Sequence, residues 1–390
     1  MPTVQTKSIG TSSRDYTTLA LFEAAIPANL VTADEQWIGE LYNDTEFAPS
    51  GLTTFTSHTT DATRDIIVRP ATGEGFADHV DATTNPLGYD QTKGVGFKTT
   101  FNYDELIQIT NSCDFMTVQG LQADCKEGFI LVSGSDNIVK DNIARAEGNY
   151  YDDGVITVNA GSAVNNMVYV DAVSGTGISL GVSAGTTRTV NNTIVYPTGQ
   201  TTSTGNGIKT YYGSGHTVTN NLILGFANAV LLNGGSGVAA GSDKNITDDS
   251  TLATGVTGTT SVVFADQIEN TAISTFDGRI KTGSDAIEAG DREASDTDDL
   301  DIIGQARSTT VPDVGCWELA PGVTYDQSDF RFYADGTESG STALEAQNVD
   351  ASIAIETTFQ VRVGIETAGD APAQTYTLQY RISTGDWGDV

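Results

Sequence analysis

The sequence predicts an all-β protein whose short strands stack as a parallel β-helix. Three observations predict this fold: the composition, a repeat through the middle of the chain, and polar residues at one position of that repeat. Among 390 residues there are 42 glycines and only 9 prolines, and Thr, Val, Ile, Asn and Asp recur throughout. This composition favours many short strands joined by tight turns over long helices.

Five segments share one pattern, a valine followed by one or two small polar residues and then a second apolar run. The marker valines are Val118, Val139, Val164, Val190 and Val218, at spacings of 21, 25, 26 and 28 residues. Between them lies a second series that begins with a glycine or alanine, such as "GVITVNAGS" and "GIKTYYGSG". Each repeat therefore contains about three short strands.

A single repeat of this kind cannot bury its apolar face, so neighbouring repeats must stack. Such a period suits one coil of a parallel β-helix, in which each coil pairs its backbone with the next about 4.8 Å away. Leucine-rich repeats need a Leu-x-x-Leu-x-Leu frame, and propellers need a period of about 40 residues. The repeat has neither property.

Small or polar residues stand two positions after each marker valine, at Gly120, Asp141, Asn166, Asn192 and Asn220. A buried asparagine at a bend can bond through its amide to the backbone and to the equivalent side chain one coil away. The alternative is a polar bend that faces solvent. We expect Asp141, Asn166, Asn192 and Asn220 to form a structural ladder.

The flanking segments complete the predicted domains. Residues 1–30 contain one amphipathic segment, "YTTLALFEAAI", which we expect to be a helix that caps the open end of the β-helix, with an interaction surface as the alternative. The inward face of this helix is predicted to carry Leu19, Leu21, Phe22, Ala25 and Ile26. The β-helix itself is assigned to residues 31–320.

Residues 324–390 follow a different pattern, in which apolar and polar residues alternate along segments such as "SIAIETTFQVRVGIETA". This alternation is typical of an antiparallel β-sandwich, and we expect an Ig-like domain. Because the sequence ends directly after an expected strand, we expect the domain to be incomplete as printed.

The charge and the cysteines exclude several classes of function. Nineteen basic against 51 acidic residues give a net charge of -32, which argues against nucleic-acid binding. No apolar run is long enough to insert into a membrane, and the first residues lack a secretory signal, so we expect folding in a cytoplasm. Cys113, Cys125 and Cys316 are an odd number without a CxxC motif, which predicts free buried thiols.

One acidic cluster is a candidate cation site. Four aspartates near the end of the repeat region are candidate Ca²⁺ ligands: Asp296, Asp298, Asp299 and Asp301. Their spacing lacks the D-x-D-x-D-G frame of a calcium loop, so the alternative is a solvated loop. No other cofactor is predicted.

A second acidic group is a candidate for catalysis. Glu147, Asp152 and Asp153 lie in "EGNYYDDG", and Asp171 follows about one coil later. Two carboxylates several ångströms apart are what glycoside hydrolysis needs, but in so acidic a chain the alternative is a solvated turn. Arg145, the nearest cation, is not expected beside a pair of aspartates, which argues against a lyase site.

Two resemblances give the fold and function a context. The twelve residues Ser284, Ala286, Ile287, Ala289, Gly290, Asp301, Gly304, Arg307, Pro312, Asp313, Gly315 and Glu318 form an ending. This ending resembles the terminus of many right-handed, single-stranded parallel β-helix proteins of the pectate-lyase-like superfamily. With the asparagine-containing coils, the resemblance covers roughly residues 100–318. It implies the fold but no particular activity.

The segments around residues 7–44 and 324–390 are similar to segments of uncharacterised phage and prophage virion-associated proteins. That resemblance implies a phage particle-surface protein, released by lysis after folding in the host cytoplasm. Phage β-helices commonly form trimeric tail spikes or fibres, and some decorate capsids. The implied partners are other virion proteins, further copies in a homotrimer or other homo-oligomer, and a host-surface glycan.

The sequence therefore leads to two hypotheses. The first is a virion structural protein without enzymatic activity, either a capsid decoration protein or a tail fibre or spike, that attaches to the particle and to the host surface. The alternative is a carbohydrate-active tail spike or polysaccharide depolymerase, a lyase or glycoside hydrolase. Tryptophan is absent from the central coils, which favours the first hypothesis because sugar-binding grooves usually contain stacked aromatic residues.

Overall fold

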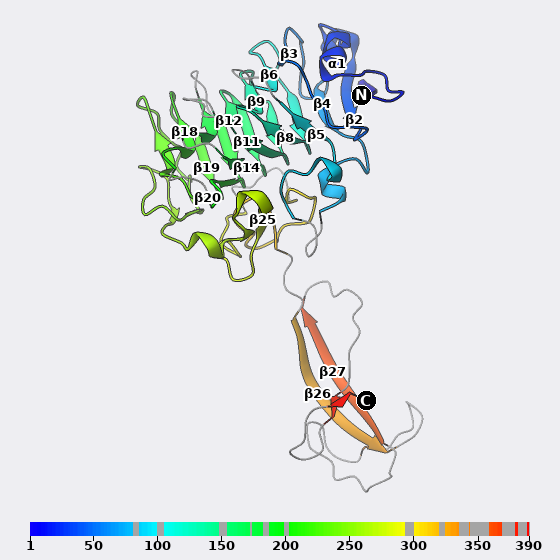
Figure 1. The fold of residues 1–390 in the computed structure, drawn as a ribbon, viewed down its shortest axis with the longest axis vertical. Helices are drawn as coiled ribbons and strands as arrows, with labels where there is room; N and C mark the ends of the chain where they lie inside the picture. The colour runs from blue at the N-terminus through cyan, green and yellow to red at the C-terminus, as the bar shows by residue number, and fades with distance from the viewer. Residues whose placement is uncertain are drawn as a thin grey trace. The chain divides into compact units, whose positions relative to one another are not determined.

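The computed structural model divides the chain into two compact units, residues 1–319 and 320–390 (Figure 1). The described residues of the first unit are 1–80, 86–99, 105–147, 154–171, 174–181, 187–198, 203–292 and 300–319. In the second unit they are Ala343 and the backbone of residues 324–334, 359–368, 379–380 and 388–389.

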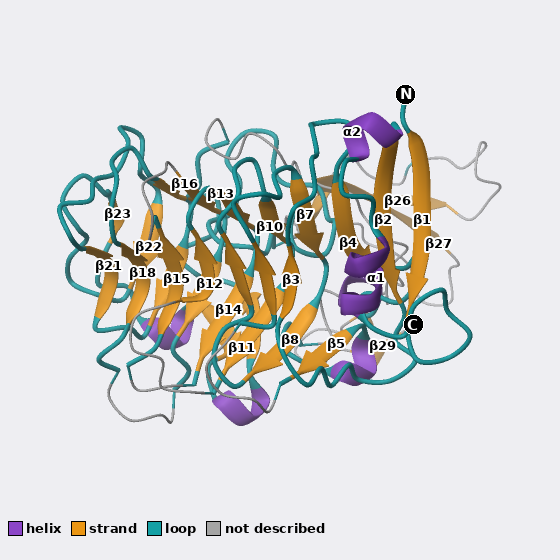
Figure 2. Ribbon diagram, turned by 90° about the horizontal axis from the view of Figure 1, so that it is seen from above, coloured by secondary structure: helices purple, strands orange, loops and turns teal. Residues whose placement is uncertain are grey.

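Three parallel sheets make up the first unit, and successive turns of the chain contribute one strand to each (Figure 2). The central strands of sheet 1 are β7 (Met116–Gln119), β10 (Ile138–Lys140), β13 (Gly161–Val164), β16 (Thr187–Val190) and β19 (Thr217–Thr219). Those of sheet 2 are β8 (Gln122–Cys125), β11 (Ile143–Ala146), β14 (Met167–Val170), β17 (Thr193–Val195) and β20 (Leu222–Leu224). Those of sheet 3 are β9 (Ile130–Val132), β12 (Gly154–Val158), β15 (Thr176–Leu180), β18 (Asn206–Thr210) and β21 (Asn228–Leu232).

The remaining strands extend these sheets at their ends. Sheet 1 begins with β1 (Thr3–Ile9), β2 (Glu35–Leu41) and β4 (Ile66–Pro70). Sheet 3 begins with β3 (Thr53–Phe55) and β6 (Ile107–Ile109). Sheet 2 begins with β5 (Gly96–Lys98) and ends with β22 (Asn245–Thr247) and β23 (Gly258–Thr259). This architecture of stacked parallel strands is compatible with a parallel β-helix, whose hand stays a prediction.

The core lies inside the coils because each sheet turns one row of aliphatic side chains inward. In sheet 3, Ile130, Ile156, Ile178 and Ile208 are partners in neighbouring strands, and each is 0% exposed. Burying one such side chain contributes about 1.5–3 kcal/mol, so a coil is stable only when it is stacked between others.

Two short helices stand at the beginning of the first unit, α1 (Leu19–Ala25) and α2 (Leu30–Ala33). The side chain of Thr18 accepts a hydrogen bond from the Leu21 N–H at 3.2 Å and begins α1. Leu19, Phe22 and Ile26 are buried, but Leu21 is 52% exposed and Ala25 is exposed, so the predicted inward face was wrong for these two. The helix spans only two turns, and a narrower stripe of side chains reaches the core.

The segment after the last coil covers the outer face of sheet 2. Met167, Leu222 and Leu224 point outward from this sheet and pack in a second apolar cluster with residues such as Trp317. The small elements that carry or flank this cluster are η1 (Phe76–Asp78), η2 (Gln91–Lys93), η3 (Phe264–Asp266), β24 (Ile268–Asn270), η4 (Ile273–Thr275) and β25 (Asp277–Ile280). Sheet 2 is therefore buried on both faces.

The second unit contains a long antiparallel pair, β26 (Thr324–Ala334) and β27 (Phe359–Ala368), and a short one, β28 (Gln379–Tyr380) and β29 (Gly388–Asp389). These pairs fit the antiparallel pattern of the sequence, and the Ig-like sandwich stays a prediction. Among the residues described in both units, no helix is long and apolar enough to cross a membrane.

Candidate functional site

A column of asparagines runs along the bend between sheets 1 and 2. Its members are Asn142, Asn166, Asn192, Asn221 and Asn245, each 0% exposed. The Oδ1 of each later asparagine accepts two hydrogen bonds from the preceding one. From Asn142 to Asn166 Oδ1 the distances are 3.1 Å for the backbone nitrogen and 3.0 Å for Nδ2. The step from Asn221 to Asn245 has the same two distances.

The second N–H of each amide is also bonded. Asn142 Nδ2 donates to the carbonyl of Val118 at 3.1 Å, and Asn166 Nδ2 donates to that of Val139 at 2.9 Å. Because the donors and acceptors of these amides are bonded within the protein, the column is a structural ladder and offers little to a ligand.

Two of the predicted ladder residues, Asn166 and Asn192, lie in this column, but Asp141 and Asn220 precede it by one residue. The marker valines caused this error, because they are not all in register. Val139 pairs with Ala163 and not with Val164. Asp141 and Asn220 instead have φ values of 56° and 56°, in the left-handed region. This conformation suits Asp, Asn and Gly.

Residues at this left-handed position fasten the segment that covers sheet 2. Asn220 Nδ2 donates to the Asp291 carbonyl at 2.8 Å, and its Oδ1 accepts from the Asp291 N–H at 2.9 Å. Two coils earlier, Asn165 Nδ2 donates to the Leu300 carbonyl at 2.9 Å. The bend thus has two functions, a ladder inside and a row of anchors outside.

The polar residues of the ending that resembles the β-helix superfamily form a buried network. Arg307 Nη1 lies 3.3 Å from Glu318 Oε2, and Arg307 Nη2 donates to Asn165 Oδ1 at 3.0 Å and to the Gly315 carbonyl at 2.7 Å. The arginine and Glu318 are each 3% exposed. These residues hold the ending against the coils, which is a structural role.

The geometry of Asp301 does not suit a calcium ligand. Its carboxylate accepts hydrogen bonds from the N–H groups of Ile303, Gln305 and Glu318 at 3.1, 2.8 and 3.1 Å, and the residue is 2% exposed. A cation would compete with these donors for the same oxygen lone pairs. Asp296, Asp298 and Asp299 lie outside the described residues. Within the described part of the chain, no group of three or more metal-ligating side chains converges.

The carboxylates proposed for catalysis meet at Arg145. Its Nη2 lies 2.9 Å from Glu147 Oε1 and 3.2 Å from Asp171 Oδ2, and its Nη1 lies 3.7 Å from Asp124 Oδ2. The expectation that no arginine stands beside an aspartate pair was therefore wrong, because the two aspartates come from the coils before and after. Asp152 and Asp153 lie outside the described residues.

The strand register of sheet 2 brings this cluster together, because Asp124, Arg145 and Tyr169 are partners in neighbouring strands. Burial lowers the pKa of Arg145, but Asp124, Tyr169, Asp171 and Glu147 together outweigh it, so the net direction is upward. The hydrogen bond to Asp124 raises the pKa of Lys98, whose Nζ lies 3.0 Å from Asp124 Oδ2. The guanidinium thus remains charged and in contact with its carboxylates.

This arrangement is a network of ion pairs across coils. In a glycosidase, two carboxylates flank a glycosidic bond, and the space between them is left for sugar and water. Here a single guanidinium nitrogen touches both Glu147 and Asp171. Two buried atoms of the cluster, Asp124 Oδ1 and Arg145 Nε, have no hydrogen-bond partner among the described residues.

A groove of about 790 Å³ crosses the outer face of sheet 1. Its floor is a row of side chains from neighbouring strands, Ile138, Ser162, Arg188 and Thr217. The lining is mixed, since apolar side chains such as Phe115 and Ile138 lie beside hydroxyl groups, the guanidinium of Arg188 and the carboxylate of Asp136.

Compared with known proteins, the chain matches no family model, and no curated protein and no solved structure is significantly similar to it.

Proposed function

We propose that this protein is a structural component of a bacteriophage particle surface, in which a right-handed β-helix is a rigid spacer. The observation that carries the proposal is the ladder of five buried asparagines, because it ties consecutive coils together with two hydrogen bonds per step. Coils that are tied together in this way form a rigid body, so its two ends stay at a constant distance.

The charged side chains support the same role. Arg145 is engaged with carboxylates of neighbouring coils, and Arg307 with Glu318 and the Gly315 carbonyl of the ending, as expected of groups that hold a scaffold. The particle surface itself is proposed from the resemblance of residues 7–44 and 324–390 to virion-associated segments. Capsid decoration and tail fibre or spike are both consistent with a spacer, and the second unit is proposed as the part that docks or adheres to the host.

Locating the protein on purified particles tests this proposal. Immunogold electron microscopy with an antibody against the first unit should label intact particles at regular positions. Label on the head would support decoration, and label on the tail would support a fibre or spike. Particles that lack the chain, with all of it in the soluble fraction of the lysate, would contradict the proposal.

The alternative function, a carbohydrate-active spike or depolymerase, is favoured by one observation, the placement of Arg145 beside carboxylates of adjacent coils, which suits a lyase more than a glycoside hydrolase. Its test is clearing of host capsular or surface polysaccharide by the purified chain, measured as new reducing ends or as unsaturated uronate absorbance. Activity that is abolished by Glu147→Gln but retained in Glu127→Gln, a carboxylate outside the cluster, would replace the structural proposal by the enzymatic one.

A further inference from the structure

Strand β1 ends sheet 1 and is hydrogen-bonded to a strand, β2, on one side only. The Thr3 N–H donates to the Asp34 carbonyl at 2.8 Å, and the Ile9 carbonyl accepts from the Tyr42 N–H at 2.9 Å. Backbone groups of successive residues alternate in direction along a strand. The groups of Val4, Thr6 and Ser8 therefore point away from β2, toward the open edge.

The open edge is limited to two residues. Ser8 is already bonded there, since its N–H donates to Asp15 Oδ2 at 2.8 Å and its carbonyl accepts from the Tyr16 N–H at 3.0 Å. The outward N–H and carbonyl groups of Val4 and Thr6 have no partner among the described residues. Val4 is 53% exposed.

The surface around this edge carries little charge for so acidic a chain. The outward residues of α1 are Ala20, Leu21, Ala24 and Ala25, all exposed, and α2 exposes Val31. Figure 2 shows both helices near β1 and β2 at the end where the chain begins. The ends of stacked-repeat proteins usually have a polar outer face. Four of the eight large apolar side chains exposed in the described residues lie here: Met1, Val4, Leu21 and Val31.

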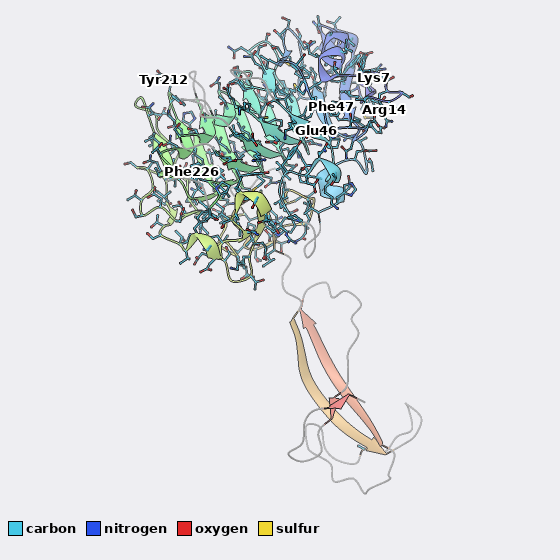
Figure 3. All side chains as sticks on the ribbon, viewed as in Figure 1. Lys7, Arg14, Glu46, Phe47, Tyr212 and Phe226 are labelled. Carbon is cyan, nitrogen blue, oxygen red and sulfur yellow. The ribbon has the colours of Figure 1, made fainter. Side chains whose placement is uncertain are left out.

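The basic groups nearby are already engaged. Lys7 Nζ lies 5.8 Å from the centre of the Trp37 ring, and Arg14 Nη2 lies 2.7 Å from Asp44 Oδ1. Figure 3 shows Lys7 and Arg14 at this end of the first unit, away from Tyr212 and Phe226 at the other. Residues 1–33 hold two basic and two acidic side chains, so this end is nearly neutral in net charge on a chain of net charge -32, with the Asp15 carboxylate at the edge beside Ser8.

We propose that this edge pairs with the same edge of a second copy, antiparallel and about a two-fold axis that passes beside Gln5. In this register Val4 lies opposite Thr6 of the second copy, and Thr6 lies opposite its Val4. The outward N–H and carbonyl groups of these two residues in each copy then form hydrogen bonds with those of the other copy. Such a self-complementary contact closes and leaves no free edge.

The neighbouring positions fit the same register. Lys7 falls opposite Thr3 of the second copy, so no like charges face each other. Pro2 falls opposite Ser8, where the carboxylate of Asp15 and the backbone of Tyr16 already lie, so the paired stretch is limited to residues 3–7. Copies with a net charge of -32 repel one another through their acidic faces, which favours a contact through this nearly neutral end. The inference does not depend on where the protein sits in a particle.

A cysteine on the two-fold axis tests the contact. Opposite residues of this type have Cα atoms about 4.5 Å apart, within the range that a disulfide bridges. With oxidised glutathione as the oxidant, Gln5→Cys should give a disulfide-linked species of twice the 40.9 kDa chain on a non-reducing gel. The three native cysteines are buried, and Val263→Cys, at a site 61% exposed, is the matched control that should remain monomeric.

Sedimentation equilibrium of the unmodified full chain provides the second measurement. We expect a dimer that is weakened at least tenfold by Val4→Lys or by Thr6→Pro, which removes an edge N–H, and is unchanged in Val263→Lys. Circular dichroism spectra that match the wild type would show that the edge variants are folded. A monomer at high concentration, a trimer, a dimer that survives both edge variants, or equal cross-linking of the two cysteine variants would overturn the proposal.

Discussion

The Oδ1 of Asn192 accepts two hydrogen bonds from Asn166, at 2.9 Å from its backbone nitrogen and at 3.0 Å from its Nδ2. The ladder is therefore directional: each asparagine supplies the acceptor that the preceding coil needs. Removal of one side chain leaves the donors of another residue unpaired.

Replacing Asn192 tests this dependence. Asn192→Leu should lower the free energy of unfolding by about 1–3 kcal/mol for each buried donor of Asn166 that it leaves unpaired. Urea denaturation followed by circular dichroism measures the change. Asn233→Leu, in an exposed turn outside the ladder, is the control and should alter stability by less than about 0.5 kcal/mol. Equal stability of the two variants would show that the ladder does not stabilise the coils.

Glycine substitutions at the left-handed position outside the bend should have different effects on stability, depending on whether the residue is an anchor. Asn220→Gly keeps the left-handed backbone but loses both bonds to Asp291, so we expect about 1–2 kcal/mol of destabilisation. Asn191 occupies the same position one coil earlier, with φ 57°, and its amide has no partner among the described residues. Asn191→Gly should therefore leave the melting temperature unchanged or raise it. The anchor assignment fails if the two glycine variants melt alike.

The cluster at Arg145 should respond to salt. Arg145→Met leaves Asp124, Glu147 and Asp171 without their shared counter-charge and should destabilise the protein by about 1–3 kcal/mol at low ionic strength. The loss should shrink in 1 M NaCl, because salt screens the exposed part of the repulsion. Arg69→Met, which removes a more exposed pair with Glu40, is the control, with an expected loss below about 1 kcal/mol. A salt-independent loss would point to packing instead.

The buried carboxyl group of Asp313 should make the stability of the folded protein depend on pH. Burial, with a smaller contribution from the charge of Glu318, raises its pKa to about 6, above the model-peptide value near 3.9. Between these values the folded state binds more protons than the unfolded state, so stability falls as pH rises through this window. The contribution reaches up to about 3 kcal/mol, at 1.36 kcal/mol per unit. Melting temperatures from pH 4 to 7 should show a steeper fall in the wild type than in Asp313→Asn. Parallel curves would refute this assignment.

The three thiols should be inert in the folded protein. Burial raises the pKa of Cys113 and of Cys316 to about 12, and Cys125 is also buried. Because the thiolate is the reactive form, Ellman's reagent should react with none of them at pH 8 and with three after unfolding in guanidinium. Rapid reaction of any native thiol would contradict the burial of that residue.

The sequence predicted the stacked parallel strands because each coil repeats its own apolar pattern. It did not predict the register, because the marker valine was not equivalent in every coil. Val139 pairs with Ala163, and the residue that recurs in register is the asparagine directly before the second strand, as Asn142 precedes Ile143 and Asn221 precedes Leu222. Alignment on that asparagine would have given the ladder from the sequence.

The surroundings of Arg145 could not be predicted in the same way. Its partners Asp124 and Asp171 are 21 and 26 residues away, and coils of unequal length hide which residues become neighbours. The role of the ending was hidden for a similar reason. Its acidic residues resembled a cation site, but Asp301 bonds backbone N–H groups, a geometry that no local sequence pattern reveals.

The two anchors at Asn165 and Asn220 connect coils that are not direct neighbours. Stacked repeats readily gain or lose a unit during evolution, since each contacts only its neighbours. Here one continuous segment is bonded at Asp291 to one coil and at Leu300 to a coil two steps away. An inserted or deleted coil between them would separate one anchor from its partner by about 4.8 Å. The covering segment therefore links two coils that do not pair with each other, in addition to the strand pairing between neighbours.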